Sequence, residues 1–289
     1  MNSDDRDASA RSAFAPLLRL DEVRADCFLA PAGPEKDGRT FGGLFLAQAL
    51  VAAQRTVGDD REVHSLHAYF LRAGDVGTAL DLEVERVRDG RSFSQRLVRA
   101  LQRDKEMFRM VLSFHVPEPG QDYARRQMPD VPAPDEITFT YNDFNQQQSP
   151  HLDAPWEGAA RPMDIRYVNP PTAPEGDPVL EDQRMWMRIA ERLGDDQNDH
   201  DAGLAYLSDS TLVDHVVLPH GQRWQDPKLN GASLDHAMWF HRRARADEWL
   251  LFDQSVESTG GARGLATGRF FDRTGRLIAT CAQEGLIRW

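Results

Sequence analysis

The amino-acid sequence predicts an α+β protein made of two tandem units, each an antiparallel sheet that wraps one long buried helix. Two observations support this fold class. Each half of the chain holds one apolar segment of helical length and then four segments rich in β-branched and aromatic residues. Similar residues also recur between the halves at a spacing of 169 positions, as from His67 to His236. The two units are expected to pair as a pseudo-dimer, as the subunits of a two-fold homodimer do.

The composition is that of a soluble globular protein. Of the 289 residues, 28% are charged and 40% are apolar, enough to bury a sizeable core. The formal net charge of −12 disfavours non-specific binding to nucleic acid or to an anionic membrane. The longest apolar run, at 44–53, is interrupted by Gln48 and is too short to span a bilayer. The sequence therefore predicts no nucleic-acid and no membrane partner.

Cysteine and histidine usage predicts neither a disulfide framework nor a metal site. Cys27 and Cys281 are the only cysteines, which suits a reducing cytoplasm. His64 and His67 stand three positions apart, a spacing that suits neither one strand face nor a zinc signature. Residues 1–13 lead into no apolar segment typical of a targeting signal. We therefore expect a cytoplasmic protein without a metal or another cofactor.

The first half is expected to consist of a flexible tail at 1–18 and a unit at 19–117. Thr40 is the expected N-cap of a helix at 44–54, which Gly42 and Gly43 open. Apolar residues on all sides of this helix predict that it is buried. Short turns make the following strands antiparallel neighbours, and these strands are expected at 64–72, 79–88, 92–102 and 106–115.

The second half is expected to follow a proline-rich interdomain linker at 118–160 and to occupy 161–289. Its helical segment is expected near 204–217, with Asp209 before the helix as Thr40 is before the first one. The expected strands lie at 163–168, 184–189, 233–241, 248–256, 262–273 and 277–288. If 233–241 is one regular strand, Ser233 and Asp235 share one face and His236 lies on the other.

The spacing of 169 places residues of unlike chemistry at three matching positions. Asp209, Ser233 and Gln283 stand where the first half has Thr40, His64 and Phe114. A structural role would predict like residues at like positions, so we expect one site whose polar groups belong to the second unit. His67 and His236 match each other and are therefore interpreted as structural.

Eight segments resemble the acyl-CoA thioesterase II family, double-hotdog enzymes that cleave fatty acyl-CoA. The resemblance covers most of 39–115 and 204–289 and implies a double-hotdog fold and an acyl-CoA substrate. The matching segments are 41–43, 63–75, 88–94, 208–209, 235–241, 256–259, 262–264 and 283–285. In that family an Asp at the start of the second helix, a Ser or Thr on the next strand and a Gln on the last strand hold the hydrolytic water. The resemblance places these roles on Asp209, Ser233 and Gln283.

The resemblance also bears on the nucleophile and on the oxyanion. It implies that Ser233 orients water and is not acylated, and the chain has no G-x-S-x-G elbow. Backbone N–H groups at a helix start, near Gly43 and Leu44 or at 210–211, are candidates for the oxyanion donor. Leu44 stands where the family often has Gln, so only its backbone is a candidate.

Basic residues are expected to bind the CoA phosphates, because the acidic chain needs local cations for a polyanionic ligand. The substrate-binding candidates are therefore Gly42, Gly43, Leu44, Arg91 and Arg263, with Arg72 and Arg88 as further basic residues.

Other functions stay open at this point. A hotdog hydratase or dehydratase would use an Asp and His pair such as Asp235 and His236, although neighbours on a strand point to opposite faces. Cys281 shares a strand face with Gln283 but lacks an identified His partner for nucleophilic catalysis. A non-catalytic acyl-CoA-binding module is the third alternative. Exposed sheet faces of this kind of fold commonly pair, so we expect a homo-oligomer, a dimer or a tetramer.

Overall fold

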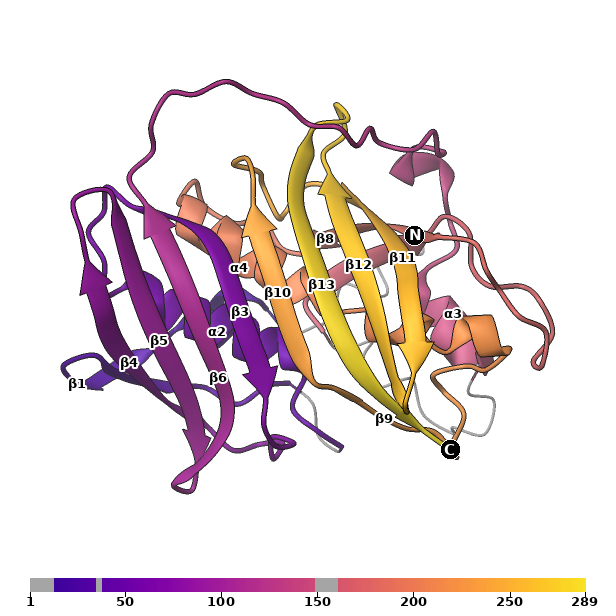
Figure 1. Ribbon diagram of the computed structural model, residues 1–289, viewed down its shortest axis with the longest axis horizontal. Helices are drawn as coiled ribbons and strands as arrows, with labels where there is room; N and C mark the ends of the chain where they lie inside the picture. Colours follow the sequence, from indigo (N-terminus) through magenta and orange to yellow (C-terminus); the bar gives the residue numbers. More distant parts are fainter. Residues whose placement is uncertain (1–12, 35–37, 149–160) are drawn as a thin grey trace.

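One antiparallel sheet runs through both halves of the chain (Figure 1). The structure is a computed structural model and describes residues 13–34, 38–148 and 161–289. Its strands in the first half are β1 (Asp21–Arg24), β2 (Cys27–Ala30), β3 (Glu62–Phe70), β4 (Leu80–Asp89), β5 (Phe93–Gln102) and β6 (Lys105–His115). Those in the second half are β7 (Met163–Tyr167), β8 (Gln183–Ile189), β9 (Asn230–Ser233), β10 (Asp235–Phe240), β11 (Leu250–Gly260), β12 (Arg263–Phe271) and β13 (Leu277–Arg288).

The two halves meet where β3 pairs with β10. The strand order is β1-β2-β4-β5-β6-β3-β10-β13-β12-β11-β8-β7, with β9 paired to β13. Two helices, α2 (Gly42–Gln54) and α4 (Gln197–Ser208), pack on each other behind the sheet (Figure 1). Within the described residues, no helix is long and apolar enough to cross a membrane.

The α2 helix is buried as the sequence predicts. Its one long polar side chain in the middle, Gln48, is fully buried, and its Nε2 donates to the carbonyl oxygens of Leu17 and Pro31, at 2.8 Å each. The predicted N-cap is wrong. Phe41 occupies the N-cap position, while the Thr40 hydroxyl donates to the carbonyl of Asp75 at 3.2 Å.

The predicted position of the second helix is also wrong. Asp209 is the C-cap of α4, so it follows this helix and does not precede it. The helix begins after Asp196, whose side chain accepts a hydrogen bond from Asn198 N at 3.0 Å. The first turns of α4 consist of polar residues, so apolar periodicity does not predict this helix. Beyond Asp209 the chain forms two 3₁₀ turns, η4 (Val213–His215) and η5 (Leu218–His220).

The repeat is present at a spacing of 170 positions in the central strands, and the predicted spacing of 169 is wrong. The N–H groups of 71–72 both donate to the Met107 carbonyl, and those of 241–242 both donate to the Ile278 carbonyl. The donors are thus 170 positions apart, and the acceptors, on the last strand of each unit, 171. The identical His-Ala pairs at 67–68 and 236–237 suggest a spacing of 169, but they occupy positions that differ by one residue in the two units.

The corrected spacing gives the site residues new counterparts. At 170 positions, and 171 in the last strand, Ser233, His236 and Gln283 correspond to Val63, Leu66 and Leu112. Asp209 is the C-cap of α4, as Arg55 is the C-cap of α2, so Thr40 is not its counterpart. His67 and His236 are likewise not counterparts. His67 is exposed on the outer face of the sheet, whereas His236 is 1% exposed. The second unit has polar groups where the first has the buried side chains of Val63, Leu66 and Leu112.

The predicted strand at 233–241 is interrupted at Leu234 by a β-bulge. Ser233 pairs with Gly285 and Ala237 with Ala282, so β9 and β10 together hold one residue more than the facing part of β13. Ser233 and His236 consequently both point to the helices, although they are three positions apart. The expectation that they lie on opposite faces is wrong for this reason.

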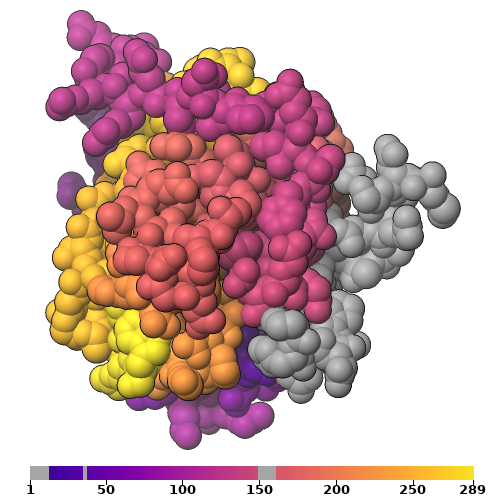
Figure 2. All heavy atoms as spheres, turned by 90° about the vertical axis from the view of Figure 1, so that its right-hand side faces the viewer, coloured from indigo at the N-terminus to yellow at the C-terminus, as the bar shows by residue number. Residues whose placement is uncertain are grey.

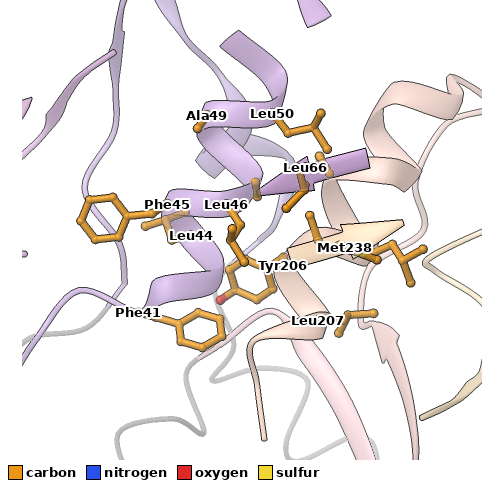
Figure 3. Close-up of a cluster of buried hydrophobic side chains, with 14 of the residues drawn as sticks. Phe41, Leu44, Phe45, Leu46, Ala49, Leu50, Leu66, Tyr206, Leu207 and Met238 are labelled. Atoms are coloured by element: carbon orange, nitrogen blue, oxygen red, sulfur yellow. The ribbon is translucent and has the colours of Figure 1, made fainter. Parts of the chain in front are cut away.

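The contact between the halves is apolar (Figure 3). Leu66 on β3 and Met238 on β10 face Leu46 of α2 and the pair Tyr206 and Leu207 at the end of α4. All five side chains are fully buried. This packing fixes the first turn of α2 against the last turn of α4, which is where Asp209 lies.

Two segments outside the predicted units pack on them. Residues 14–18 of the expected tail include a 3₁₀ turn, η1 (Ala15–Leu18), and a fully buried Phe14. The rings of Phe14 and Tyr206 pack edge to face, with their centroids 5.2 Å apart. Part of the segment expected as a tail thus packs on the protein, and residues 1–12 lie outside the described part.

The expected linker docks on the second unit, as Figure 2 shows for the segment after β6. Its structured parts are η2 (Pro134–Glu136) and α3 (Tyr141–Gln148). The indole N–H of Trp186 donates to the Pro132 carbonyl at 2.9 Å. The boundaries of the two units remain a prediction, and residues 149–160 lie outside the described part.

Candidate active site

The carboxyl group of Asp209 is the centre of the candidate site. Gln283 Nε2 donates to Asp209 Oδ1 at 2.5 Å. The Ser233 hydroxyl and the backbone N–H of Gly43 lie close enough to this carboxyl group to lower its pKa. Asp209 ends α4, Ser233 lies beside the β-bulge and Gln283 is on β13, so the fold brings together the three residues that the sequence singled out.

Glycines allow the first turn of α2 to approach this carboxyl group. A Cβ on Gly42 would lie 2.5 Å from Asp209 Oδ2, and a Cβ on Gly43 would lie 2.4 Å from the Tyr206 carbonyl. Only glycine fits at these two positions without displacement of the neighbours. The positive end of the α2 dipole thus points to a carboxylate, which stabilises its charge.

The pKa of Asp209 is raised to about 6, because burial penalises its charged form. The hydrogen bond from Gln283 and the charge of Arg161 lower the pKa and offset part of this effect. At neutral pH the group is therefore mainly ionised, and its proton affinity is much higher than that of an ordinary aspartate. These are the properties of a general base.

A cavity of about 800 Å³ opens beside Asp209 and Ser233. Gln283 is fully buried and does not line the cavity, so it contacts Asp209 from the protein interior. The apolar lining residues include Phe41, Phe45, Phe70, Leu71, Trp224 and Leu234. A ligand in this cavity can reach the carboxyl and hydroxyl groups from a largely aromatic surround.

A second carboxyl group, on Asp214, lines the same cavity and was missed in the sequence. Burial raises its pKa to about 7, and the hydroxyl of Tyr141 donates to it. Tyr141 comes from α3, in the docked linker. Asp214 stands within the buried apolar run at 212–217, and a lone carboxylate in such a run is a signal that the sequence did contain.

Of the predicted basic residues, Arg72 lines the cavity, whereas Arg91 and Arg263 do not. Arg91 and Arg263 are exposed, and Arg263 pairs with Glu284 at 3.0 Å. The basic residues that line the cavity are Arg39, Arg72 and Arg161, of which the sequence had indicated Arg72. Arg161 also lies over the ring of Phe41, with its guanidinium carbon 4.0 Å from the ring centroid.

The backbone of Leu44 is not available as an oxyanion donor. Its N–H donates to the Phe41 carbonyl at 3.1 Å, its side chain is buried in the core, and it does not line the cavity. The alternative at Ser210 is equally engaged, because its N–H donates to the Leu207 carbonyl at 3.1 Å. Gly42, in contrast, lines the cavity, and among the described residues its N–H has no backbone acceptor.

The alternative nucleophile and the alternative acid-base pair have other environments. Cys281 is fully buried, and burial raises the pKa of its thiol well above the ordinary value, which suppresses the thiolate. Asp235 Oδ1 accepts a hydrogen bond from the backbone N–H of Glu284 at 2.8 Å and does not line the cavity. Within the described residues, no cluster of three or more His, Cys, Asp or Glu side chains could hold a metal ion.

Comparison with known proteins identifies the family. Residues 160–286 match the family model described as acyl-CoA thioesterase, and 31–115 match that of the acyl-CoA thioesterase N-terminal domain. Acyl-coenzyme A thioesterase 8 from Homo sapiens is 39% identical over 281 residues, which cover 94% of this chain and 88% of that protein.

Solved structures agree. Acyl-CoA thioesterase II TesB2 from Mycobacterium marinum superposes with a TM-score of 0.77 and 38% identity, over 95% of this chain and 97% of that chain. A protein with a hotdog fold from Alicyclobacillus acidocaldarius has a TM-score of 0.76 at 19% identity, over 96% of this chain and 99% of that chain. The double-hotdog fold class predicted from the sequence is thereby confirmed. The chain belongs to the acyl-CoA thioesterase family, whose members are hydrolases of thioester bonds.

Proposed function

We propose that this chain hydrolyses fatty acyl-CoA with a water molecule that Asp209 and Ser233 hold in the cavity, while Gln283 fixes Asp209 from the interior. The observation that carries the proposal is the environment of Asp209. This carboxyl group has a raised pKa, a hydrogen bond from Gln283, the Ser233 hydroxyl and the Gly43 N–H nearby, and access to the cavity. It can therefore take a proton and still keep one orientation.

The reaction would proceed by direct attack of water. The water oxygen bonds to the thioester carbonyl carbon as its proton passes to the Asp209 carboxylate. The carbonyl oxygen gains negative charge, which the N–H of Gly42 at the positive end of α2 is placed to stabilise. The carbon–sulfur bond then breaks, the CoA sulfur takes the proton back from Asp209, and the fatty acid leaves as the second product.

The polar part of the substrate would lie near the cavity's basic residues. Arg39 and Arg72 line the cavity on the side of the first unit, and both are exposed. CoA carries several phosphate charges, and the chain as a whole has a net charge of −12. Local arginines are therefore needed to attract it.

The experiment that tests this function follows free thiol release from a panel of acyl-CoA esters of increasing chain length. We expect thiol release together with an equal amount of fatty acid. Hydration of an enoyl-CoA without thiol release would instead indicate a hydratase. Binding of acyl-CoA with no thiol release would indicate a binding module, and either result would refute the proposal.

The pH dependence of kcat/KM should show the titration of Asp209. Because its pKa in the folded protein is raised to about 6, the base is protonated and inactive below this pH and ionised above it. We therefore expect kcat/KM to rise with pH through about pH 6. A profile measured between about pH 4.5 and pH 8 checks this, with Asp214→Asn as the control that should leave the limb in place. If this rise of kcat/KM near pH 6 is absent in Asp214→Asn, the group that titrates is Asp214 and not Asp209.

We also infer that the protein forms a homo-oligomer through the outer face of the sheet. Tyr69, Val111 and Trp239 are 62%, 46% and 39% exposed there, on the neighbouring strands β3, β6 and β10. Exposed aromatic side chains in one area are typical of a contact surface. Light scattering should give a mass of at least twice 32.6 kDa. A monomer at micromolar concentration would contradict this.

The cytoplasmic location of the protein stays a prediction.

A further inference from the structure

His236 is buried directly behind the candidate site. It lies on β10, next to β13, and the pairing of Ala237 with Ala282 places it opposite Gln283 on the inner side of the sheet. Its side chain is 1% exposed, and that of Gln283 is fully buried. His236 does not line the cavity, so it has no direct access to a ligand.

His236 lies between the end of α4 and Gln283, the residue that donates to Asp209. Its Nε2 lies 2.9 Å from the hydroxyl oxygen of Ser208, the last residue of α4. On the other side, Gln283 uses its Nε2 to donate to Asp209, so its Oε1 faces away from that carboxyl group. Gln283 Oε1 and His236 Nδ1 are both buried, and neither has a hydrogen-bond partner among the described residues. An amide oxygen and a ring nitrogen on neighbouring strands thus face the same interior without any other polar group to pair with.

The protonation of the ring follows from its environment. Burial lowers the pKa of His236 to about 4, so the ring is neutral at pH 7 and carries a single N–H. The Gln283 amide acts in the opposite direction and raises this pKa, as an acceptor oxygen beside the ring does. With the N–H on Nδ1, the ring presents a donor to the amide oxygen, and Nε2 accepts from the Ser208 hydroxyl, which has the Ala205 carbonyl at 2.8 Å as its alternative acceptor.

The repeat supplies an independent argument. The counterpart of His236 in the first unit is Leu66, which is fully buried, and the counterpart of Gln283 is Leu112, which is 1% exposed. The fold therefore accepts leucine at both positions. A buried histidine and a buried glutamine each need a hydrogen-bond partner, which costs stability when it is missing. Both polar residues occur only in the unit that carries Asp209.

We propose that His236 is a positioning residue for the hydrolytic site: its Nδ1–H holds the Gln283 amide oxygen and thereby directs the Gln283 N–H to Asp209. An amide whose oxygen is not held can turn by half a rotation and present its oxygen to the carboxylate, which would repel it. Ser208 fixes the ring from its other nitrogen. This inference rests on the proposed hydrolytic function.

The test compares His236→Leu with His236→Asn in the full-length protein. Leucine restores the residue of the first unit, so the variant is expected to fold, but it cannot bind the amide oxygen. We expect kcat for acyl-CoA hydrolysis to fall by about 10- to 100-fold with KM little changed. The side-chain amide of asparagine can supply an N–H near the position of Nδ1, so His236→Asn should recover most of kcat. The control is His67→Leu, at an exposed histidine on the outer face of the sheet, and this variant should leave kcat unchanged.

A double-mutant cycle separates positioning from general structural damage. If His236 acts through Gln283, His236→Leu should have no further effect on kcat in the Gln283→Ala background. The acid limb of the pH profile should also move to higher pH in His236→Leu, because the Gln283 hydrogen bond lowers the pKa of Asp209.

Two results would overturn the inference while leaving the hydrolytic function in place. One is wild-type kcat in His236→Leu, and the other is an additive loss in the double variant. Absence of thiol release by the wild-type protein would instead count against the proposed function itself.

Discussion

Replacement of Asp209 by asparagine is expected to lower kcat for acyl-CoA hydrolysis by about 10²- to 10⁴-fold, the usual contribution of general base catalysis. Asparagine has the same shape, and its amide oxygen can still accept the hydrogen bond from Gln283. It cannot take a proton from water. The loss should therefore fall on kcat, with little change in KM. Thiol release at pH 7.5 or so, well above the Asp209 pKa of about 6, measures it.

The same variant should be more stable than the wild type at neutral pH. The pKa of Asp209 is higher in the folded protein, at about 6, than its ordinary value of 3.8. A raised pKa means that the folded state binds this proton more tightly, so the contribution of Asp209 to stability falls as pH rises from about 4 to 6. Above pH 6 the buried charge costs about 3 kcal/mol, from a shift of roughly two units. Asparagine removes that cost, and the loss of the charge-assisted hydrogen bonds offsets part of the gain.

Thermal unfolding at two pH values checks this linked effect. Asp209→Asn should unfold at a higher temperature than the wild type at pH 7, and the difference should shrink near pH 4. Reduced activity with increased stability is the combination expected of a functional residue. A variant that retains its kcat, or one that loses activity because it unfolds, would contradict the role given to Asp209.

The second large effect is expected for Gly42→Ala. The added Cβ would lie 2.5 Å from Asp209 Oδ2 and 2.9 Å from the ring of Phe70. The carboxyl group must then move away from the first turn of α2 or the helix must retreat from it. A displacement of about 1 Å at a reacting group can cost on the order of 100-fold in rate. We expect a loss of this size in kcat/KM from thiol-release assays.

The matched control is Gly120→Ala, where the new Cβ would meet no atom within 4 Å. This variant should keep the activity and melting temperature of the wild type. Gly42→Ala is expected to keep its fold, because the obstructing atoms are side-chain atoms that can shift at moderate cost. Full activity of Gly42→Ala would show that the close approach of α2 to Asp209 has no part in the reaction.

Much of this arrangement could be predicted from residues alone. Strands of alternating pattern, the apolar helix at α2 and the unlike chemistry of the halves led to Asp209, Ser233 and Gln283. In the structure, Gln283 donates to the Asp209 carboxyl group and the Ser233 hydroxyl lies near it. The spacing of 169 is off by one residue, but the resemblance to the thioesterase family indicates the same three residues independently of that spacing.

The register of the repeat could not be predicted. His67 and His236 are the same amino acid at a spacing of 169. The hydrogen bonds of the paired strands show that the two halves align at 170 positions. The bulge at Leu234 is similarly invisible in the sequence, and it is the reason that His236 points to the site. For this reason the histidine was interpreted as a structural residue.

Residues that enter the site from distant segments were also missed. Tyr141 comes from a linker that showed no pattern of its own, and Arg161 lies just before β7. Neither position follows from local periodicity, because tertiary packing alone brings them to Asp214 and Phe41. Arg91 and Arg263 were chosen for their charge, and charge does not determine which side of the molecule a residue occupies.

Direct attack by water is the central claim, and a rapid-quench experiment tests it. Protein mixed with excess acyl-CoA is quenched within the first turnover, and thiol, fatty acid and intact protein mass are measured on the same sample. We predict equal amounts of thiol and fatty acid at every time and a protein of unchanged mass. A burst of thiol with an acyl group attached to the protein at Ser233 would contradict this mechanism.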